Sequence, residues 1–223
     1  MQKYVIIAAG GIGVRMKSSI PKQYLSVNDV PVIIHTINKF QLAIHGIKIV
    51  VVLPSDRINS WEQFCKENNF KFNHEICAGG NTRFHSIKKG LDLIKGHALV
   101  AIHDAVRPLV TIALIQDIFK HAESHGNAVP AIKMDQAVRI IEGKVNKAVD
   151  RDKFRIIQTP QCFHSEILRK AYQQDYDESF TDDAIVVERT GEVINLIEGD
   201  INNIKITTQQ DMLIAETLIA SGF

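Results

Sequence analysis

The sequence of 223 residues has little of what marks several classes of protein. Its three cysteines form no CxxC pair and no metal-ligand spacing, so we predict neither a disulfide framework nor a metal site. The formal net charge is only +1, which gives no reason to expect a nucleic acid or a membrane surface as partner. The first apolar run, residues 4–9, is too short for a signal sequence or a membrane span. We therefore expect a cytoplasmic protein with reduced thiols.

Other familiar signatures are also missing. We find no internal repeat, no low-complexity linker, no nucleophile elbow and no Ser-His-Asp order. A composition with 45% hydrophobic and 23% charged residues is typical of a globular protein, and this length can bury an extensive core. We therefore expect one domain spanning residues 1–223.

Short apolar runs alternate with segments of helical period. The runs read as buried strands and cover residues 4–8, 48–53, 73–77, 98–103 and 128–132. The helical segments between them cover residues 31–42, 56–68, 82–94 and 111–125. Strands that are apolar on both faces and separated by helices predict a Rossmann-like, doubly wound α/β fold with a mostly parallel sheet. Ligands in such a fold bind beyond the carboxyl ends of the strands.

The pattern changes after Lys133. Short β-like runs at 137–141 and 145–149 surround Glu142-Gly143, so residues 133–158 are expected to form a protruding β arm. A turn is expected at 158–161, and the chain then returns to helices at 165–174, 181–189 and 208–220 and a strand at 193–197.

The loop after the first strand reads Ala8-Ala9-Gly10-Gly11-Ile12-Gly13-Val14-Arg15, and Pro21-Lys22 follows. Glycines let backbone N–H groups approach phosphate oxygens. The third glycine of a dinucleotide fingerprint is missing, and no G-K-[ST] follows as a P-loop would require. Arg15 and Lys22 instead place two cations behind the glycines, which suits stabilisation of a triphosphate under attack at its α-phosphorus. A glycine turn with two solvated cations is the alternative.

Two further loops carry polar residues at strand ends. Residues 79–83 read Gly-Gly-Asn-Thr-Arg, so the backbone at Gly80 could contact a flat base while Asn81 and Ser86 bind polar groups; a plain turn with Asn81 as helix N-cap fits the residues equally well. Residues 103–108 read His-Asp-Ala-Val-Arg-Pro, in which Asp104 could orient a substrate and Arg107 could bind phosphate or bridge to Asp104.

Later segments add further candidates. Lys205 lies between two isoleucines, and Arg151 precedes the turn that contains Thr159. Either cation could also be structural, because lysine often extends its charge past apolar neighbours.

Together these segments resemble the 2-C-methyl-D-erythritol 4-phosphate cytidylyltransferase family of the non-mevalonate isoprenoid pathway. The resemblance spans nearly the whole chain in order, and it rests on AAGGIGVRM…PKQYL (8–25), GGNTRFHS (79–86), HDAVRP (103–108), DR…QTPQCF (150–163), TDDAIVVE (181–188) and NNIKIT (202–207).

The resemblance implies transfer of CMP from CTP to a polyol phosphate with release of pyrophosphate. It assigns CTP binding to Ala8, Ala9, Gly10, Gly11, Gly13, Gly80, Asn81 and Ser86. Arg15 and Lys22 would stabilise the transition state, while Arg151 and Lys205 would position the polyol phosphate. Asp104, Arg107, Thr159 and Thr181 would shape the substrate pocket. The family also implies a homodimer formed partly by the arm, with Arg151 reaching the partner's site, and Mg²⁺ held mainly by CTP phosphates rather than by the protein.

One segment departs from the family pattern. The arm usually carries an Asp followed by Ser or Thr, but residues 134–139 read Met-Asp-Gln-Ala-Val-Arg and contain no hydroxyl. A ribitol-5-phosphate cytidylyltransferase therefore stays open, although the glutamate in TDDAIVVE favours the methylerythritol enzyme. A non-catalytic nucleotide-binding module also stays open and, on fold alone, so does a dehydrogenase.

Overall fold

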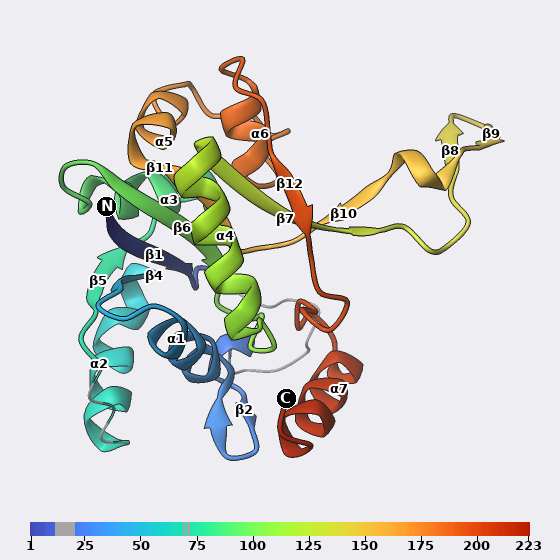
Figure 1. The fold of residues 1–223 in the computed structure, drawn as a ribbon. Helices are drawn as coiled ribbons and strands as arrows, with labels where there is room; N and C mark the ends of the chain where they lie inside the picture. The colour runs from blue at the N-terminus through green and yellow to red at the C-terminus, as the bar shows by residue number, and fades with distance from the viewer. Residues whose placement is uncertain (12–20, 69, 71) are drawn as a thin grey trace.

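A computed structural model describes residues 1–11, 21–68, 70 and 72–223. Its main sheet runs in the order β10-β7-β11-β6-β1-β4-β5, and β12 pairs with β7 (Figure 1). The strands at one end of this order are β10 (Arg155–Ile157), β7 (Asn127–Lys133), β11 (Gln161–His164) and, beside β7, β12 (Leu196–Glu198). The strands on either side of the first one are parallel to it: β1 (Gln2–Ala8) pairs with β4 (Lys48–Leu53) and β6 (Ala98–Asp104), and β4 pairs with β5 (Glu75–Ala78). The predicted doubly wound α/β fold with a mostly parallel sheet is confirmed.

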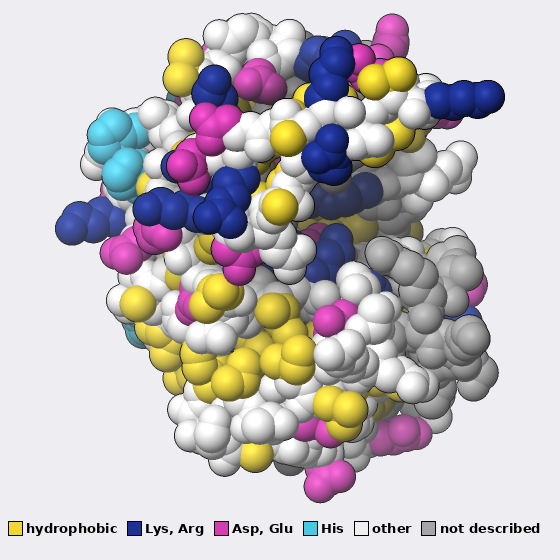
Figure 2. Space-filling model, turned by 90° about the vertical axis from the view of Figure 1, so that its right-hand side faces the viewer, with side chains coloured by type: hydrophobic (Ala, Val, Ile, Leu, Met, Phe, Trp, Pro, Cys, Tyr) yellow, Lys and Arg dark blue, Asp and Glu magenta, His cyan; other side chains and the backbone are white. Residues whose placement is uncertain are grey.

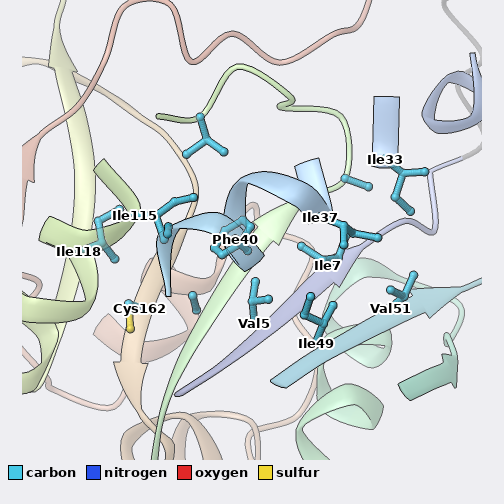
Figure 3. Close-up of a cluster of buried hydrophobic side chains, with 14 of the residues drawn as sticks. Val5, Ile7, Ile33, Ile37, Phe40, Ile49, Val51, Ile115, Ile118 and Cys162 are labelled. Carbon is cyan, nitrogen blue, oxygen red and sulfur yellow. The ribbon is translucent and has the colours of Figure 1, made fainter. Parts of the chain in front are cut away.

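Successive residues of the buried strands belong to two separate cores, because side chains alternate between the two faces of a strand. On one face Val5 and Ile7 pack with residues of α1 (Val32–Ala43) and α4 (Ile112–His125) (Figure 3), and Trp61 of α2 (Ile58–Glu67) belongs to the same cluster. On the other face Tyr4 and Ile6 pack with α3 (Arg83–Asp92), α5 (Ser165–Ala171) and α6 (Asp183–Glu188). The apolar runs of the sequence are therefore strands covered on both sides.

A third, smaller core attaches the C-terminal helix α7 (Gln209–Ala220) near the end of β6. Val106 and Leu109, which follow β6, pack against Ile206 and against Ala215 of α7. The short pair β2 (Ser26–Val27) and β3 (Val30–Pro31) contributes Val27 to the same cluster. This packing places residue 205 beside the loop after β6.

The segment predicted as a turn at 158–161 leads directly into a strand that the sequence did not indicate. This strand, β11 (Gln161–His164), is antiparallel to both β6 and β7 (Asn127–Lys133) and lies between them. It has only four residues, too few to show a period. The short strand β10 (Arg155–Ile157) was missed for the same reason, and it pairs with the end of β7.

Several boundaries also shift by a few residues. The predicted helix at 56–68 begins as a 3-10 turn, η3 (Ser55–Arg57), and the strand expected at 193–197 is β12 (Leu196–Glu198). The helices expected at 165–174 and 181–189 are shorter than predicted, because α5 ends at Ala171 and Asp182 is the N-cap of α6.

The arm leaves the sheet after β7 and returns at β10, where Arg155 pairs with Lys133. Its outer part is the hairpin β8 (Arg139–Glu142) and β9 (Val145–Ala148), which turns at Gly143 with φ of +62°. Every residue of the two hairpin strands is exposed, and the arm extends away from the body in Figure 1. Within the described residues, no helix is both long and apolar enough to span a membrane.

Candidate active site

One pocket lies at the carboxyl ends of β1, β4, β5 and β6, the edge at which the fold predicts a ligand. It is lined by Ala8, Ala9, Gly10, Gly11, Lys22, Gln23, Val52, Gly80, Asn81, Thr82, Arg83, Ser86, Asp104, Ala105, Val106 and Lys205. The loop after β1, the segment of Lys22, the turn before α3, the loop after β6 and Lys205 therefore border one pocket. Gly13 and Arg15 lie outside the described residues.

The first wall is held by backbone hydrogen bonds to neighbouring strands. The N–H of Ala9 donates to the carbonyl of Val52 at 2.9 Å, and the N–H of Ala105 donates to the carbonyl of Ala8 at 3.2 Å. The buried amide of Gln23 donates to the carbonyl of Ala9 at 2.8 Å. Gln23 thus joins the segment that carries Lys22 to the glycine loop, a role that sequence reasoning missed.

The second wall is the turn between β5 and α3. The Ser86 hydroxyl accepts from the N–H of Gly80 at 3.0 Å and donates to the carbonyl of Thr82 at 2.8 Å. A Cβ at position 80 would lie 2.5 Å from the Cβ of His85, so only glycine fits there. Thr82, not Asn81, is the N-cap of α3, because its hydroxyl accepts from the N–H of His85. Asn81 lines the pocket and is exposed.

The charged centre of the pocket is Asp104, whose side chain is only 10% exposed. Its Oδ2 lies 3.1 Å from Nζ of Lys205 and 3.1 Å from Nε of Arg107. Burial alone would raise the pKa of Asp104, but the charges of Lys205, Arg83 and Arg107 outweigh it and hold that pKa well below its usual range. Asp104 is therefore a carboxylate that orients a cation at the pocket.

Lys22 and Lys205 face this same pocket. Nζ of Lys22 donates to the carbonyl of Ile206 at 3.0 Å, so the head group of Lys22 reaches the residue next to Lys205. Two cations from opposite ends of the chain thus lie beside the glycine loop. Such a pair can stabilise negative charge on a bound phosphate.

Arg107 has a different place from the one that phosphate binding would require. It does not line the pocket; its Nε donates to Asp104, and its Nη1 donates to the carbonyl of Asn203 at 2.7 Å. Its side chain is 12% exposed. Of the two interpretations open from the sequence, the structure shows the bridge that shapes the loop.

The two threonines also stand back from the pocket surface. Thr159 is 5% exposed, and its hydroxyl accepts from the N–H of Asp104 at 3.1 Å. Thr181 is exposed and does not line the pocket. Thr159 therefore contacts the site through Asp104. Thr181 lies in the segment before α6 and is not among the residues that line the pocket.

An ion pair that sequence reasoning missed joins a residue of the pocket lining to a buried carboxylate. Arg83 lines the pocket and donates two hydrogen bonds to Asp183, at 2.8 and 2.5 Å, and the Tyr172 hydroxyl donates to the same carboxylate at 2.6 Å. Asp183 is fully buried. No local sequence pattern links residues 83 and 183, because they lie a hundred positions apart and meet only where α3, α5 and α6 share one core.

Arg151 lies on the arm, away from this chain's own pocket. It begins the 3-10 helix η4 (Arg151–Lys153), is exposed, and donates to the carbonyl of Asp135 at 2.5 Å. Residues 133–158 contain seven Lys or Arg against four Asp or Glu, so the arm is more basic than the whole chain. Figure 2 shows Lys and Arg gathered over the upper part of the face on the side from which the arm projects.

The described residues contain no group of three His, Cys, Asp or Glu that could hold a metal ion. Asp104 is the acidic residue among those lining the pocket, and two cations already occupy its carboxylate. This donor set does not suit a Mg²⁺ held by protein ligands, which prefers one or two available carboxylates besides phosphate oxygens.

The chain matches known proteins over nearly its full length. The family model for IspD, 2-C-methyl-D-erythritol 4-phosphate cytidylyltransferase, matches residues 3–221. Proteins of that name are 44% identical in Porphyromonas gingivalis, covering 99% of each chain, and 41% identical in Bacteroides thetaiotaomicron, covering 98% of this chain and all of the relative.

Solved structures agree with the sequence matches. The crystal structure of 2-C-methyl-D-erythritol 4-phosphate cytidylyltransferase from Thermus thermophilus is 28% identical, covers 99% of this chain and 100% of its own, and has a TM-score of 0.79. That of 4-diphosphocytidyl-2C-methyl-D-erythritol synthase from Anaerococcus prevotii is 25% identical over 98% of both chains, with a TM-score of 0.83. Full-length matches in sequence and in structure lead to one conclusion: this chain belongs to the 2-C-methyl-D-erythritol 4-phosphate cytidylyltransferase family.

Proposed function

We propose that the protein joins CTP and 2-C-methyl-D-erythritol 4-phosphate, forming 4-diphosphocytidyl-2-C-methyl-D-erythritol and pyrophosphate. A phosphate oxygen of the polyol attacks the α-phosphorus of CTP, and the bond to the β-phosphate oxygen breaks as pyrophosphate leaves. The single observation that supports this reaction best is the presence of Lys22 and Lys205 at one pocket with a glycine loop. The family and its relatives favour this polyol over ribitol 5-phosphate.

In this proposal the glycine loop and the turn after β5 hold the nucleotide. Ala8, Ala9, Gly10 and Gly11, with Gly13, bind the phosphates through backbone groups, and Gly80, Asn81 and Ser86 bind the base and ribose. The narrow space at Gly79 and Gly80 supports this role, because a side chain at either position would meet Ser86 or His85. A flat pyrimidine can lie close to such a backbone.

Catalysis would consist of positioning and charge stabilisation. The attacking phosphate is already ionised at neutral pH, so no general base is required. Lys22 and Arg15 stabilise the extra charge on the α-phosphate oxygens in the transition state. Lys205, oriented by Asp104, holds the phosphate of the polyol in line, while Arg107 and Thr159 hold Asp104 in place.

The arm would complete the site of a second subunit. We propose a homodimer in which Arg151 of one subunit contacts the polyol phosphate bound by the other. The exposed, basic character of the arm, its projection away from the body in Figure 1 and the absence of Arg151 from the residues lining its own pocket support this arrangement. Mg²⁺ would enter on the phosphates of CTP, and the protein would act in the cytoplasm, where its three free thiols stay reduced.

A pyrophosphate-release assay tests the reaction. The protein is mixed with CTP, Mg²⁺ and either 2-C-methyl-D-erythritol 4-phosphate or ribitol 5-phosphate, and ATP, GTP and UTP replace CTP in parallel. We expect turnover with CTP and the methylerythritol phosphate. Faster turnover with ribitol 5-phosphate would reject the substrate, and tight binding of CTP without turnover on either polyol would favour a non-catalytic module.

A further inference from the structure

A buried histidine lies directly beneath the charged centre of the pocket. His103 precedes Asp104 at the end of β6, is 0% exposed, and packs with its ring edge-on to Phe40. Its Nδ1 lies 3.0 Å from the hydroxyl oxygen of Thr159, and its Nε2 lies 3.2 Å from the carbonyl oxygen of Arg107. The imidazole does not line the pocket, so it cannot touch a bound substrate directly.

The partners of the imidazole determine which nitrogen carries the proton. The Arg107 carbonyl can only accept, so Nε2 must donate to it. The Thr159 hydroxyl oxygen already accepts from the N–H of Asp104, and its own proton is available for Nδ1. His103 is therefore neutral with its proton on Nε2, and burial, which lowers its pKa to about 3, keeps it so.

These hydrogen bonds connect both ends of the 104–107 loop, which carries Asp104 and Arg107. His103 binds the carbonyl of Arg107 and, through Thr159, the N–H of Asp104. Arg107 reaches across to Asn203, and the Asn203 amide donates to the carbonyl of Thr159 at 2.8 Å. Asn203 lies two residues before Lys205 in the chain. Both partners in the Asp104–Lys205 pair are thus tied to one buried network.

We infer that His103 is a positioning residue for the transfer reaction, holding the 104–107 loop so that Asp104 orients Lys205 toward the polyol phosphate. The inference rests on the proposed function. A histidine that only filled the core would need no specific tautomer and would not join both ends of this loop. Nor would it connect through Thr159 and Arg107 to the segment of Lys205.

Three variants separate the two bonds. His103→Asn places an amide oxygen near Nδ1 and keeps the Thr159 bond; His103→Gln places an amide N–H near Nε2 and keeps the Arg107 bond; His103→Phe keeps neither. We expect kcat/KM for the methylerythritol phosphate to fall about fivefold in the Asn and Gln variants, the size expected for one lost hydrogen bond, and at least about 25-fold in the Phe variant. KM for CTP should change by less than about twofold, as expected if the CTP-binding contacts are intact.

A matched control uses His164, whose Nε2 bonds the carbonyl of Ala122 at 3.0 Å at the opposite end of the sheet. His164→Phe should lower the melting temperature without changing either kinetic constant. Wild-type kcat/KM in both His103→Asn and His103→Gln would overturn the inference, as would an equal rise of KM for CTP and polyol. If His103→Phe does not fold, the Asn and Gln variants decide.

An NMR measurement tests the tautomer without any substrate. Long-range ¹H–¹⁵N spectra of the wild-type protein at neutral pH should show His103 neutral and protonated on Nε2. A proton on Nδ1 would contradict the hydrogen bonds inferred to Thr159 and Arg107. If the wild-type enzyme is active and the His103→Asn and His103→Gln variants keep its kcat/KM, this inference is rejected and the proposed function stands. A wild-type protein that transfers nothing from CTP rejects the proposed function while the NMR result still stands.

Discussion

Two acidic side chains, Asp104 and Asp183, are buried beside the pocket, and each lies against an arginine. A buried carboxylate is costly unless charges and hydrogen bonds compensate for the lost water. Asp104 pairs with Lys205, which lines the pocket. Asp183 instead accepts hydrogen bonds from Arg83 and from the Tyr172 hydroxyl. Asp104 therefore orients Lys205 at the pocket, whereas we expect Asp183 chiefly to stabilise the fold.

Removing the buried carboxylate should cost far more than removing an exposed one. Asp183→Ala leaves Arg83 and the Tyr172 hydroxyl without their acceptor, and we expect the free energy of unfolding to fall by about 3–5 kcal/mol. Asp177→Ala removes the exposed partner of Arg189 and should lower the free energy of unfolding far less, because water already solvates that carboxylate. Urea denaturation of the two variants measures both values. Similar small losses would show that the buried pair contributes little.

The protonation of His103 makes a prediction about acid. Burial lowers its pKa to about 3 in the folded protein, although the nearby Asp104 carboxylate and the hydrogen bond to the Arg107 carbonyl favour the proton. The unfolded chain binds a proton below about pH 6.5. The contribution of His103 to the free energy of unfolding should therefore be fully present above pH 6.5. It should fall as the pH drops toward 4, by up to about 1.4 kcal/mol per pH unit. Urea denaturation at several pH values should show a shallower slope for His103→Gln, and equal slopes would contradict the assignment.

At the scale of elements, the site depends on loops held by helix caps and short strands. The apolar runs of β1, β4 and β6 were predictable because each is continuous and buried on both faces. The strand β11 was not, because its four residues follow a segment that reads as a turn, and its pairing with β6 is set by tertiary packing. The glycines, Lys22 and Lys205 were recognisable by position, but the Arg83–Asp183 pair was not, since it joins residues a hundred positions apart.

The C-terminal helix α7, which the third core attaches near the pocket, begins with a capping box. The Thr208 hydroxyl accepts from the N–H of Asp211, and the Asp211 carboxylate accepts from the N–H of Thr208. Partial burial would raise the pKa of Asp211, but hydrogen bonds from Thr207 and Thr208 lower it below its usual value.

Loss of this cap should weaken the whole fold modestly. We expect Thr208→Ala to lower the free energy of unfolding by about 1 kcal/mol. Thr217→Ala is the matched control, because that exposed hydroxyl only donates to the carbonyl of Leu213 within the same helix, and it should change stability by less than about 0.5 kcal/mol. Thermal or urea unfolding of both variants gives the comparison. A Thr208→Ala protein as stable as the control would mean that α7 does not depend on its cap.

At the scale of the whole molecule, the sequence predicted an arm without showing what the arm binds. Both strands of its hairpin are exposed on every residue, so packing against the rest of the described residues does not explain the arm. Sequence spacing cannot show a second subunit, because the fold of one chain is complete without it. The proposed dimer makes the arm part of an active site.

Mixed dimers test whether Arg151 acts in the partner's site. Arg151→Ala and Lys22→Ala should each be nearly inactive alone. When the two are mixed and allowed to exchange subunits, one site of each mixed dimer has an intact Lys22 and receives an intact Arg151, so pyrophosphate release should reappear. Mixed dimers that form, as shown by differently tagged subunits, yet stay inactive would place Arg151 in its own subunit's site or outside the reaction.

We expect cations from distant parts of the chain to stabilise the α-phosphate of CTP during transfer. The rate of CMP transfer in a single turnover, compared between the wild-type protein and Lys22→Ala, tests it most directly. We predict that this rate falls by about 100-fold or more while the Kd for CTP changes less than about tenfold and the melting temperature stays close to that of the wild type. A folded Lys22→Ala protein that transfers CMP at the wild-type rate would contradict the claim.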